Sequence, residues 1–148
     1  MRSRILIAAG LFSLVTVIAS ARLVPNATPA DEAEVRAALQ HYLLGHATGD
    51  GAHFRVVFHP DSKLYFNREG KFSTRTSEDY IAGAAGKPAA DEDKRKRRIV
   101  SVDVTGDAAM AKVELDYPNA VLTDYFTLLK VDGKWMIMNK IFNTNPKR

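Results

Sequence analysis

The first clear pattern in the sequence is a run of apolar residues at helical spacing between positions 29 and 48. Thr28 is a suitable N-cap for this helix, and Gly49 predicts its end. A second, short helix is predicted from Asp50 to His59, because the following Pro60 disfavours the α conformation in the residue before it. The face of the first helix that should meet the core carries Val35, Leu39, Tyr42, Leu43 and His46.

The second half of the chain alternates between apolar and polar residues, which is the pattern of half-buried strands. Four strands are predicted here, joined by short turns that require antiparallel neighbours. A hairpin over residues 63–76 and a short helix from Thr76 to about Ala85 precede them, and residues 86–98 are predicted to be a loop. We therefore expect an α+β fold: a cone-like curved antiparallel sheet wrapped around the long N-terminal helix, with two shorter helices. The predicted strands cover about residues 99–105, 108–117, 122–131 and 134–143.

The N-terminal segment has the pattern of an export signal. Two arginines within the first four residues precede a largely apolar, uncharged run, which ends in small residues at Ala21. We expect residues 1–21 to be a signal peptide that is cleaved after Ala21, residues 22–30 to be a linker, and residues 31–145 to form the domain. The mature protein would then be periplasmic or secreted, with no membrane contact. The alternative is a protein anchored in a membrane by an uncleaved N-terminal helix.

The composition limits the possible chemistry. The 148 residues include 21 Lys and Arg, 17 Asp and Glu, and no Cys. The absence of Cys excludes disulfides, thiolate metal sites and cysteine nucleophiles. No pattern of His and acidic residues supplies three metal ligands at helix or strand spacing, so we expect no metal and no other cofactor.

Five consecutive cations, Lys94 to Arg98, form the strongest local charge in the sequence. Three acidic residues directly precede them, and no aromatic residue is interleaved on which a base could stack. We therefore expect a solvated loop and no nucleic-acid partner.

The sharpest chemical signal is a carboxylate on an apolar strand face. Asp124 shares its predicted face with Phe126, and a buried carboxylate should be protonated or hydrogen-bonded because an unpaired charge is costly to bury. Tyr42 lies on the apolar face of the first helix. Both residues also fit an ordinary role in the core. His46 and His59 are the histidines best placed to accept a proton near neutral pH.

Motifs in several segments are those of one known family. They are the helix from Gln40 to Asp50, the junction from Phe58 to Asp61, and Asp124-Tyr125-Phe126 followed by Val131 to Trp135. Over residues 32–145 the sequence resembles the nuclear-transport-factor-2-like (NTF2-like) superfamily. Within that superfamily it is most similar to the SnoaL-like group named "putative lumazine-binding".

The resemblance suggests roles for the tyrosine and the buried carboxylate. In ketosteroid isomerase, a member of the superfamily, a helix Tyr and a strand Asp form an oxyanion hole. The matching residues here are Tyr42 and Asp124. The general-base Asp of that enzyme has no counterpart, because Phe66 stands at the matching position with Asn67 beside it. Only the polarising half of such a site is therefore implied.

We expect an exported small-molecule-binding protein, with an apolar ligand in a cavity between the sheet and the helices. One alternative is an isomerase or dehydratase acting on an enolisable carbonyl compound, with Tyr42 and Asp124 as oxyanion donors and His59 or His46 as the base. Another is a non-catalytic interaction module that uses the outer sheet face. On the last strand, at most one of Asn139 and Lys140 can face the cavity. The candidate ligand-binding residues are Tyr42, His46, His59, Asp124, Phe126 and Lys140.

The last strand also predicts an assembly. Trp135 and Ile137 on one side and Met136 and Met138 on the other make both of its faces apolar, although a single packed face needs only one. Folds of the family that the sequence resembles pair sheet to sheet. We therefore expect a homodimer formed through the outer face of the sheet.

Overall fold

The structure is a computed structural model and describes residues 28–148. The predicted signal peptide and most of the predicted linker lie outside the described residues. None of the helices in the described part has the length and apolar character needed to cross a membrane.

Local capping explains where the three helices begin and end. Thr28 and Asp31 form a reciprocal capping box at the start of the first helix, which begins at Pro29 as its cap predicts. Gly49 ends it in the left-handed conformation, with φ of 71°. Asp50 and Thr76 cap the other two helices through their side chains. The helices are α1 (Pro29–Thr48), α2 (Gly51–Val57) and α3 (Ser77–Ala82), and α3 ends earlier than predicted.

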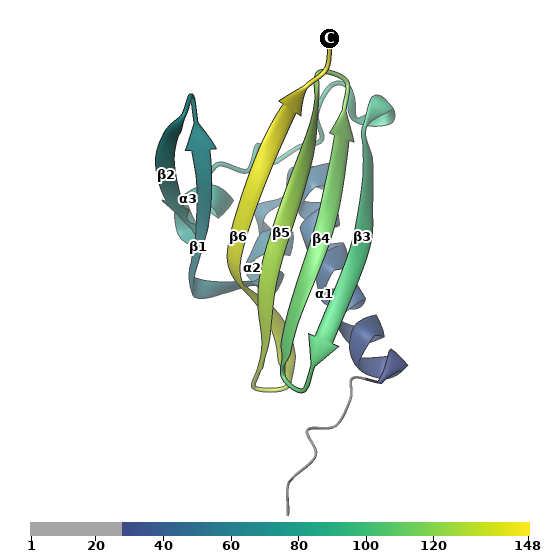
Figure 1. Cartoon of the computed structure of the whole chain (residues 1–148). Coiled ribbons are helices and arrows are strands. Elements are labelled where there is room, and N and C mark those ends of the chain that lie inside the picture. Colours follow the sequence, from purple (N-terminus) through teal and green to yellow (C-terminus); the bar gives the residue numbers. More distant parts are fainter. Residues whose placement is uncertain (1–27) are drawn as a thin grey trace, which may run out of the picture.

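Six strands form one sheet in the order β2-β1-β6-β5-β4-β3 (Figure 1). The antiparallel meander from β3 to β6 is as predicted. The sheet differs from the prediction at one pair, because β1 joins β6 in parallel and the whole sheet is mixed. The strands are β1 (Phe58–Arg68), β2 (Lys71–Thr76), β3 (Lys96–Thr105), β4 (Ala108–Tyr117), β5 (Ala120–Val131) and β6 (Lys134–Pro146).

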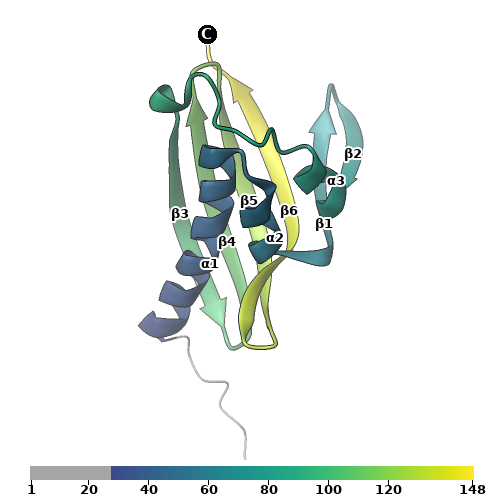
Figure 2. The same ribbon diagram turned by 180° about the vertical axis from the view of Figure 1, so that it is seen from behind.

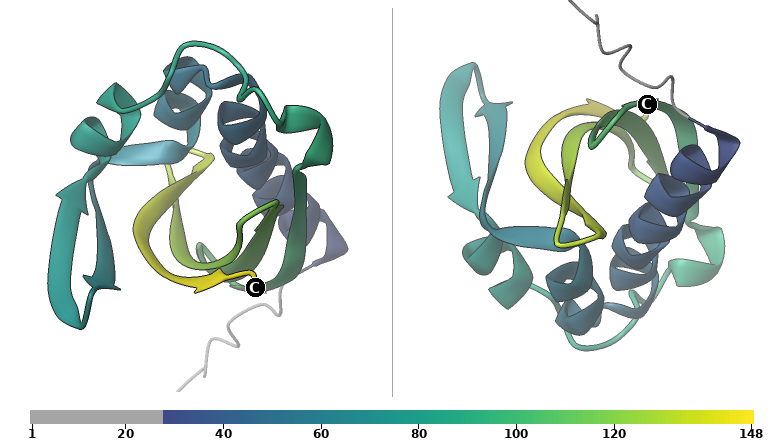
Figure 3. Two further views of the ribbon diagram at one scale, coloured as in Figure 1. Left: turned by 90° about the horizontal axis from the view of Figure 1, so that it is seen from above. Right: turned by 90° about the horizontal axis from the view of Figure 1, so that it is seen from below.

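Helices α1 and α2 cover one face of the β3–β6 part of the sheet, and α3 stands beside β1 (Figure 2). The views along the long axis show the strands curving around this helical layer (Figure 3). The core lies between the two layers, with Leu39 and Val57 from the helices against Leu115 and Ile137 from the sheet. The α+β class and the curved sheet around a long helix are therefore confirmed. We call the helix-covered side of the sheet the inner face and the other side the outer face.

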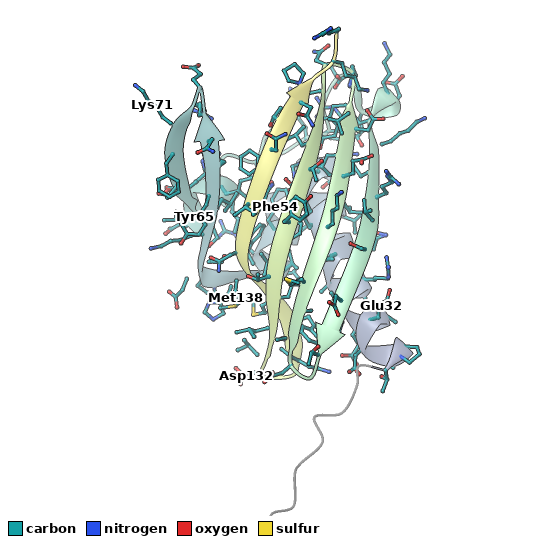
Figure 4. The ribbon with its side chains drawn as sticks, viewed as in Figure 1. Glu32, Phe54, Tyr65, Lys71, Asp132 and Met138 are labelled. Carbon is teal, nitrogen blue, oxygen red and sulfur yellow. The ribbon has the colours of Figure 1, made fainter. Side chains whose placement is uncertain are left out.

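Two bulges change which side chains reach the inner face. In β6, Thr127 and Leu128 of β5 pair with Asn139 and Ile137, so Met138 is an extra residue (Figure 4). An extra residue reverses the alternation of faces beyond it. As a result Ile137 and Lys140 both point inward, although strict alternation would place them on opposite faces.

The second bulge lies in β3, where Val100 is the extra residue between the paired residues Ile99 and Ser101. It brings Arg97 to the inner face together with Val102. The prediction of a loop over residues 86–98 was therefore wrong at its end. A short 3₁₀ turn, η1 (Glu92–Lys94), precedes β3, which begins at Lys96. Local sequence missed this strand start because five cations in a row do not alternate in polarity.

Candidate functional site

Tyr42 and Asp124 meet in the interior. Helix α1 and strand β5 bring them together, and the Tyr42 hydroxyl donates a hydrogen bond of 2.6 Å to Asp124 Oδ2. Both residues are 0% exposed. Burial, followed by the negative charge of Asp124, raises the pKa of Tyr42 well above its ordinary value, so the phenol keeps its proton. The ring of Phe126 packs edge-on against Tyr42, with 4.9 Å between the ring centroids.

Lys140 completes this cluster. Its Nζ donates a 2.5 Å hydrogen bond to the Tyr42 hydroxyl and lies 3.1 Å from Asp124 Oδ1. The second contact is an ion pair by distance only, because among the described residues no donor is aligned for a hydrogen bond to Oδ1. Lys140 is 3% exposed. Burial lowers its pKa, although the nearby Asp124 charge opposes that shift. We call Tyr42, Asp124 and Lys140 the buried triad.

His46 and Tyr80 continue the network toward the surface. The Tyr80 hydroxyl lies 3.5 Å from that of Tyr42 and 2.8 Å from His46 Nε2, and His46 Nδ1 lies 3.2 Å from the Tyr117 hydroxyl. Burial, followed by the positive charges of Lys140 and two arginines, lowers the pKa of His46 well below its ordinary value. The imidazole is therefore neutral near pH 7, with one nitrogen as donor and the other as acceptor.

Arg97 supports the His46 end of the network from β3. Its guanidinium binds both carboxylate oxygens of Glu92, at 2.5 and 2.7 Å, and donates a 3.2 Å hydrogen bond to the backbone carbonyl of His46. A bidentate pair of this kind fixes the guanidinium in orientation as well as in position. Arg97 thereby ties the last turn of α1 to the first residues of β3.

A pocket of about 380 Å³ opens directly beside His46 and Tyr80. We call it the helix pocket, because the C-terminal end of α1, helices α2 and α3, and residues 83–90 supply most of its wall. Gly49 allows residues 83–90 to approach closely, since a Cβ there would lie 2.1 Å from the Lys87 carbonyl oxygen. The residues that line the helix pocket are Gly45, His46, Gly49, Phe54, Arg75, Tyr80, Gly83, Ala84, Ala85, Lys87, Pro88, Ala89, Ala90 and Arg95.

The structure separates the predicted site residues into a pocket residue, an interior cluster and His59. His46 borders the helix pocket, whereas Tyr42, Asp124, Lys140 and Phe126 lie behind it in the interior and do not line it.

His59 stands apart at the start of β1. Its Nδ1 accepts a 3.2 Å hydrogen bond from the Asp61 backbone N–H, and its carbonyl accepts hydrogen bonds from Ser62 and Ser77. These contacts shape the turn into β1, and none of them reaches the helix pocket.

Sequence reasoning missed two members of the network, Tyr80 and Tyr117. Tyr80 is the fourth residue of α3 after the Thr76 cap, so the cap was the only available signal that α3 presents it inward. Tyr117 ends β4 and is recognisable only once its hydrogen bonds to His46 and Arg97 are seen. Within residues 28–148, no group of three or more His, Asp or Glu side chains is arranged to hold a metal ion.

A second and larger hollow of about 610 Å³ lies on the outer face, across β3 to β6. Tyr65 of β1, which is labelled in Figure 4, stands at its side. We call it the outer groove. Met110 and Ile141, which line it, are 60% and 53% exposed. The outer groove and the helix pocket therefore lie on opposite sides of the sheet.

Comparison with known proteins identifies the family. The sequence family described as "Putative lumazine-binding" matches residues 30–143. Aldolase FrzH of Cladobotryum sp is 26% identical over 99 residues, which cover 67% of this chain and 79% of FrzH.

Solved structures agree with this assignment. An NTF2-like protein of unknown function from Shewanella baltica OS155 superposes with a TM-score of 0.72 and 26% identity, covering 82% of this chain and 100% of that one. An NTF2-like protein from Methylobacillus flagellatus KT gives a TM-score of 0.70 and 28% identity, covering 80% and 95%. Because the family match extends over most of the sequence and the fold agrees, the chain belongs to the "Putative lumazine-binding" family of the NTF2-like superfamily.

Proposed function

We propose that the protein binds a small molecule in the helix pocket and holds one of its oxygen or nitrogen atoms with Tyr80 and His46. The observation that carries this proposal is the position of the pocket at the outer end of a buried hydrogen-bond network. Its volume of about 380 Å³ suits a small ligand. The sequence suggested a ligand between the sheet and the helices, but the buried triad occupies that space. The site proposed here is instead the helix pocket, at the surface end of the same hydrogen-bond network.

The lining suggests the character of the ligand. Phe54 and a run of Ala and Pro side chains offer an apolar wall, while Arg75, Lys87 and Arg95 place positive charge around it. His46 and Tyr80 supply the polar contacts at the inner end. A compact, mostly apolar molecule that carries a carbonyl or ring nitrogen, with an anionic group toward the rim, fits this lining. The anionic group is the feature that the sequence did not suggest.

Binding of lumazine, the heterocycle in the family's description, is a direct test. Titration calorimetry of the wild type should give a measurable affinity, and Tyr80→Phe should weaken it by about 0.5–1.5 kcal/mol, the net contribution of one hydrogen bond. Tyr65→Phe is the matched control, because it removes a phenol from the outer groove. Equal weakening in the two variants, or a wild-type affinity that neither changes, would contradict a site at the helix pocket.

A second candidate function is catalysis on an enolisable carbonyl compound. Two observations favour it: a neutral His46, able to accept a proton, beside the Tyr42–Asp124 pair, and the similarity to aldolase FrzH. Tyr42 already donates to Asp124, so its polarising effect on a ligand would act through Tyr80.

This second function predicts that the protein exchanges α-protons of a simple ketone for deuterium in heavy water, as followed by proton NMR. His46→Gln should abolish the exchange, while His59→Gln should leave it unchanged, since His59 lies outside the network. Absence of exchange with cyclohexanone and with acetone would favour binding without catalysis.

We also propose that the protein is exported and forms a homodimer. Export is supported by the apolar N-terminal run that ends at Ala21. Secretion of a product that begins at Arg22 would support it, and intact Met1 in a membrane fraction would favour the anchored alternative. The homodimer is supported by the exposed apolar residues of the outer groove. If another protein occupies that face instead, the chain serves as an interaction module.

A further inference from the structure

We propose that the amine of Lys140 condenses with an aldehyde or ketone of the ligand to form an imine. This step rests on the binding site proposed above, because the carbonyl must enter through the helix pocket. It goes beyond that site by assigning a covalent role to a side chain that reversible binding does not use.

The surroundings of the amine carry the argument. Nζ makes one short hydrogen bond, to the Tyr42 hydroxyl, and approaches Asp124 Oδ1 without an aligned hydrogen bond. It otherwise faces aromatic rings, at 5.0 Å from the centroid of Tyr42, 5.2 Å from that of Tyr80 and 4.8 Å from that of Phe142.

Charged and titratable groups from four other elements face this amine: Tyr42 of α1, Asp124 of β5, Tyr80 of α3 and Arg75 of β2. Burial is the largest cause that lowers the pKa of Lys140, and the positive charge of Arg75 lowers it further, while the negative charge of Asp124 raises it. A larger share of the amine is therefore uncharged at neutral pH than on a surface lysine. Only the uncharged amine attacks a carbonyl.

Tyr80 connects the amine to the pocket. Tyr80 lines the pocket, the centroid of its ring lies 5.2 Å from Nζ, and its hydroxyl lies 2.8 Å from His46 Nε2. If a ligand carbonyl replaces His46 as the hydrogen-bond partner of the Tyr80 hydroxyl, and the Tyr80 ring turns aside, the carbonyl carbon comes next to the amine. Access of the carbonyl to Lys140 therefore depends on movement of the Tyr80 side chain, which is partly buried and belongs to the short helix α3.

The bond changes balance without an oxidant or reductant. The Nζ lone pair forms a C–N bond to the carbonyl carbon, and the two protons of the uncharged amine leave the nitrogen in turn through Asp124. Tyr42 and Tyr80 relay these same two protons to the carbonyl oxygen, the C–O bond breaks, and the oxygen leaves as one water molecule. The product is the imine, and its reversal by water restores the free lysine.

Acetylacetone is a suitable probe, because its imine rearranges to a stable enaminone. The purified wild-type protein is incubated with acetylacetone near pH 7 and analysed by intact mass and peptide mapping. The expected result is one adduct, with the mass of acetylacetone less one water, located on Lys140. Its formation should be at least tenfold faster than on Lys134, an exposed lysine of the same strand.

Variants separate the possible outcomes. Lys140→Met combined with Asp124→Asn avoids a lone buried charge and should lose the adduct, whereas Lys134→Met should keep it. Tyr80→Ala should accelerate labelling by opening the route. Labelling of Lys140 no faster than of Lys134 overturns the covalent step, even if lumazine still binds. Conversely, rapid labelling of Lys140 without any Tyr80-dependent lumazine binding refutes the proposed reversible ligand while leaving the covalent step supported.

Discussion

The two faces of the sheet depart from the usual pattern in different ways. The inner face is apolar except at the buried triad, where Asp124 and Lys140 are almost wholly withdrawn from solvent. The outer face exposes apolar ones, among them Met110, Tyr125 and Ile141. An ordinary antiparallel sheet packed on helices buries apolar side chains on one face and exposes polar ones on the other.

These two departures indicate that neither face is explained by folding stability alone. A buried ion pair is weak support for stability, because apolar residues of similar volume often serve as well or better. A continuous apolar groove on a lone soluble domain is a liability for solubility. The ligand binding proposed for the inner side and the association proposed for the outer face would account for both departures.

The largest expected effect comes from breaking the buried triad. Lys140→Met leaves the Asp124 carboxylate buried without its cation, which should lower the free energy of unfolding by about 3–5 kcal/mol. Adding Asp124→Leu removes the remaining charge and should recover most of that loss. Urea unfolding followed by circular dichroism measures both. Lys134→Met, with its exposed side chain, should change the free energy by less than about 0.5 kcal/mol. A small loss in Lys140→Met alone would mean that water reaches the triad.

A substitution on the outer face should weaken dimerisation without changing the stability of the monomer. Ile141→Asp places a charge in the outer groove, and a symmetric dimer would carry it twice. We expect dimerisation to weaken by about tenfold to a hundredfold, which is about 1.4–2.8 kcal/mol. Light scattering over a concentration series measures this change, while thermal unfolding of the monomer should barely shift. A wild type that is monomeric throughout the series would refute the dimer.

A moderate effect is expected in the pH dependence of stability. The native fold lowers the pKa of His46 below about 6.5, its value in the unfolded chain. Below that pH the unfolded chain binds a proton that the native protein does not, so the native state loses stability as the pH falls from 6.5 toward the native pKa. Above pH 6.5 this contribution is complete.

His46→Gln should therefore flatten the acid side of the profile, measured as urea unfolding between pH 7.5 and pH 5. His59→Gln removes an imidazole outside the network. If that variant flattens the profile as much as His46→Gln does, then His46 is not the source of the slope.

The smallest effect is expected from Arg98, the exposed neighbour of Arg97. Its bridge to Glu114 is on the surface, so Arg98→Gln should cost less than about 1 kcal/mol and progressively less as salt is added. Arg97→Gln should cost more, because it releases Glu92 and the His46 carbonyl together. If chemical denaturation shows the same loss in the free energy of unfolding for both variants, then the buried contacts of Arg97 stabilise the fold no more than the surface bridge of Arg98 does.

Local patterns were sufficient to predict the helices, the meander and the inward direction of Tyr42 and Asp124. Each of these depends on spacing or capping within a few residues. They did not predict the role of Arg97, and they left open whether Asn139 or Lys140 faces the interior, because bulges at Val100 and Met138 reverse the strand alternation near these residues. The parallel pairing of β1 with β6 was also missed, since it joins segments far apart in the sequence.

The position of β6 has a consequence for how the chain is made. This strand comes after every other element in the sequence, yet it lies between β1 and β5 in the sheet. Until residues 134–146 leave the ribosome, both neighbours remain open edges that can pair with other chains. The sheet cannot close until residues 134–146 are available, and the many distant pairings that β6 makes should keep folding slow. Until then, the two open edges of β1 and β5 are the surfaces that a chaperone would have to cover.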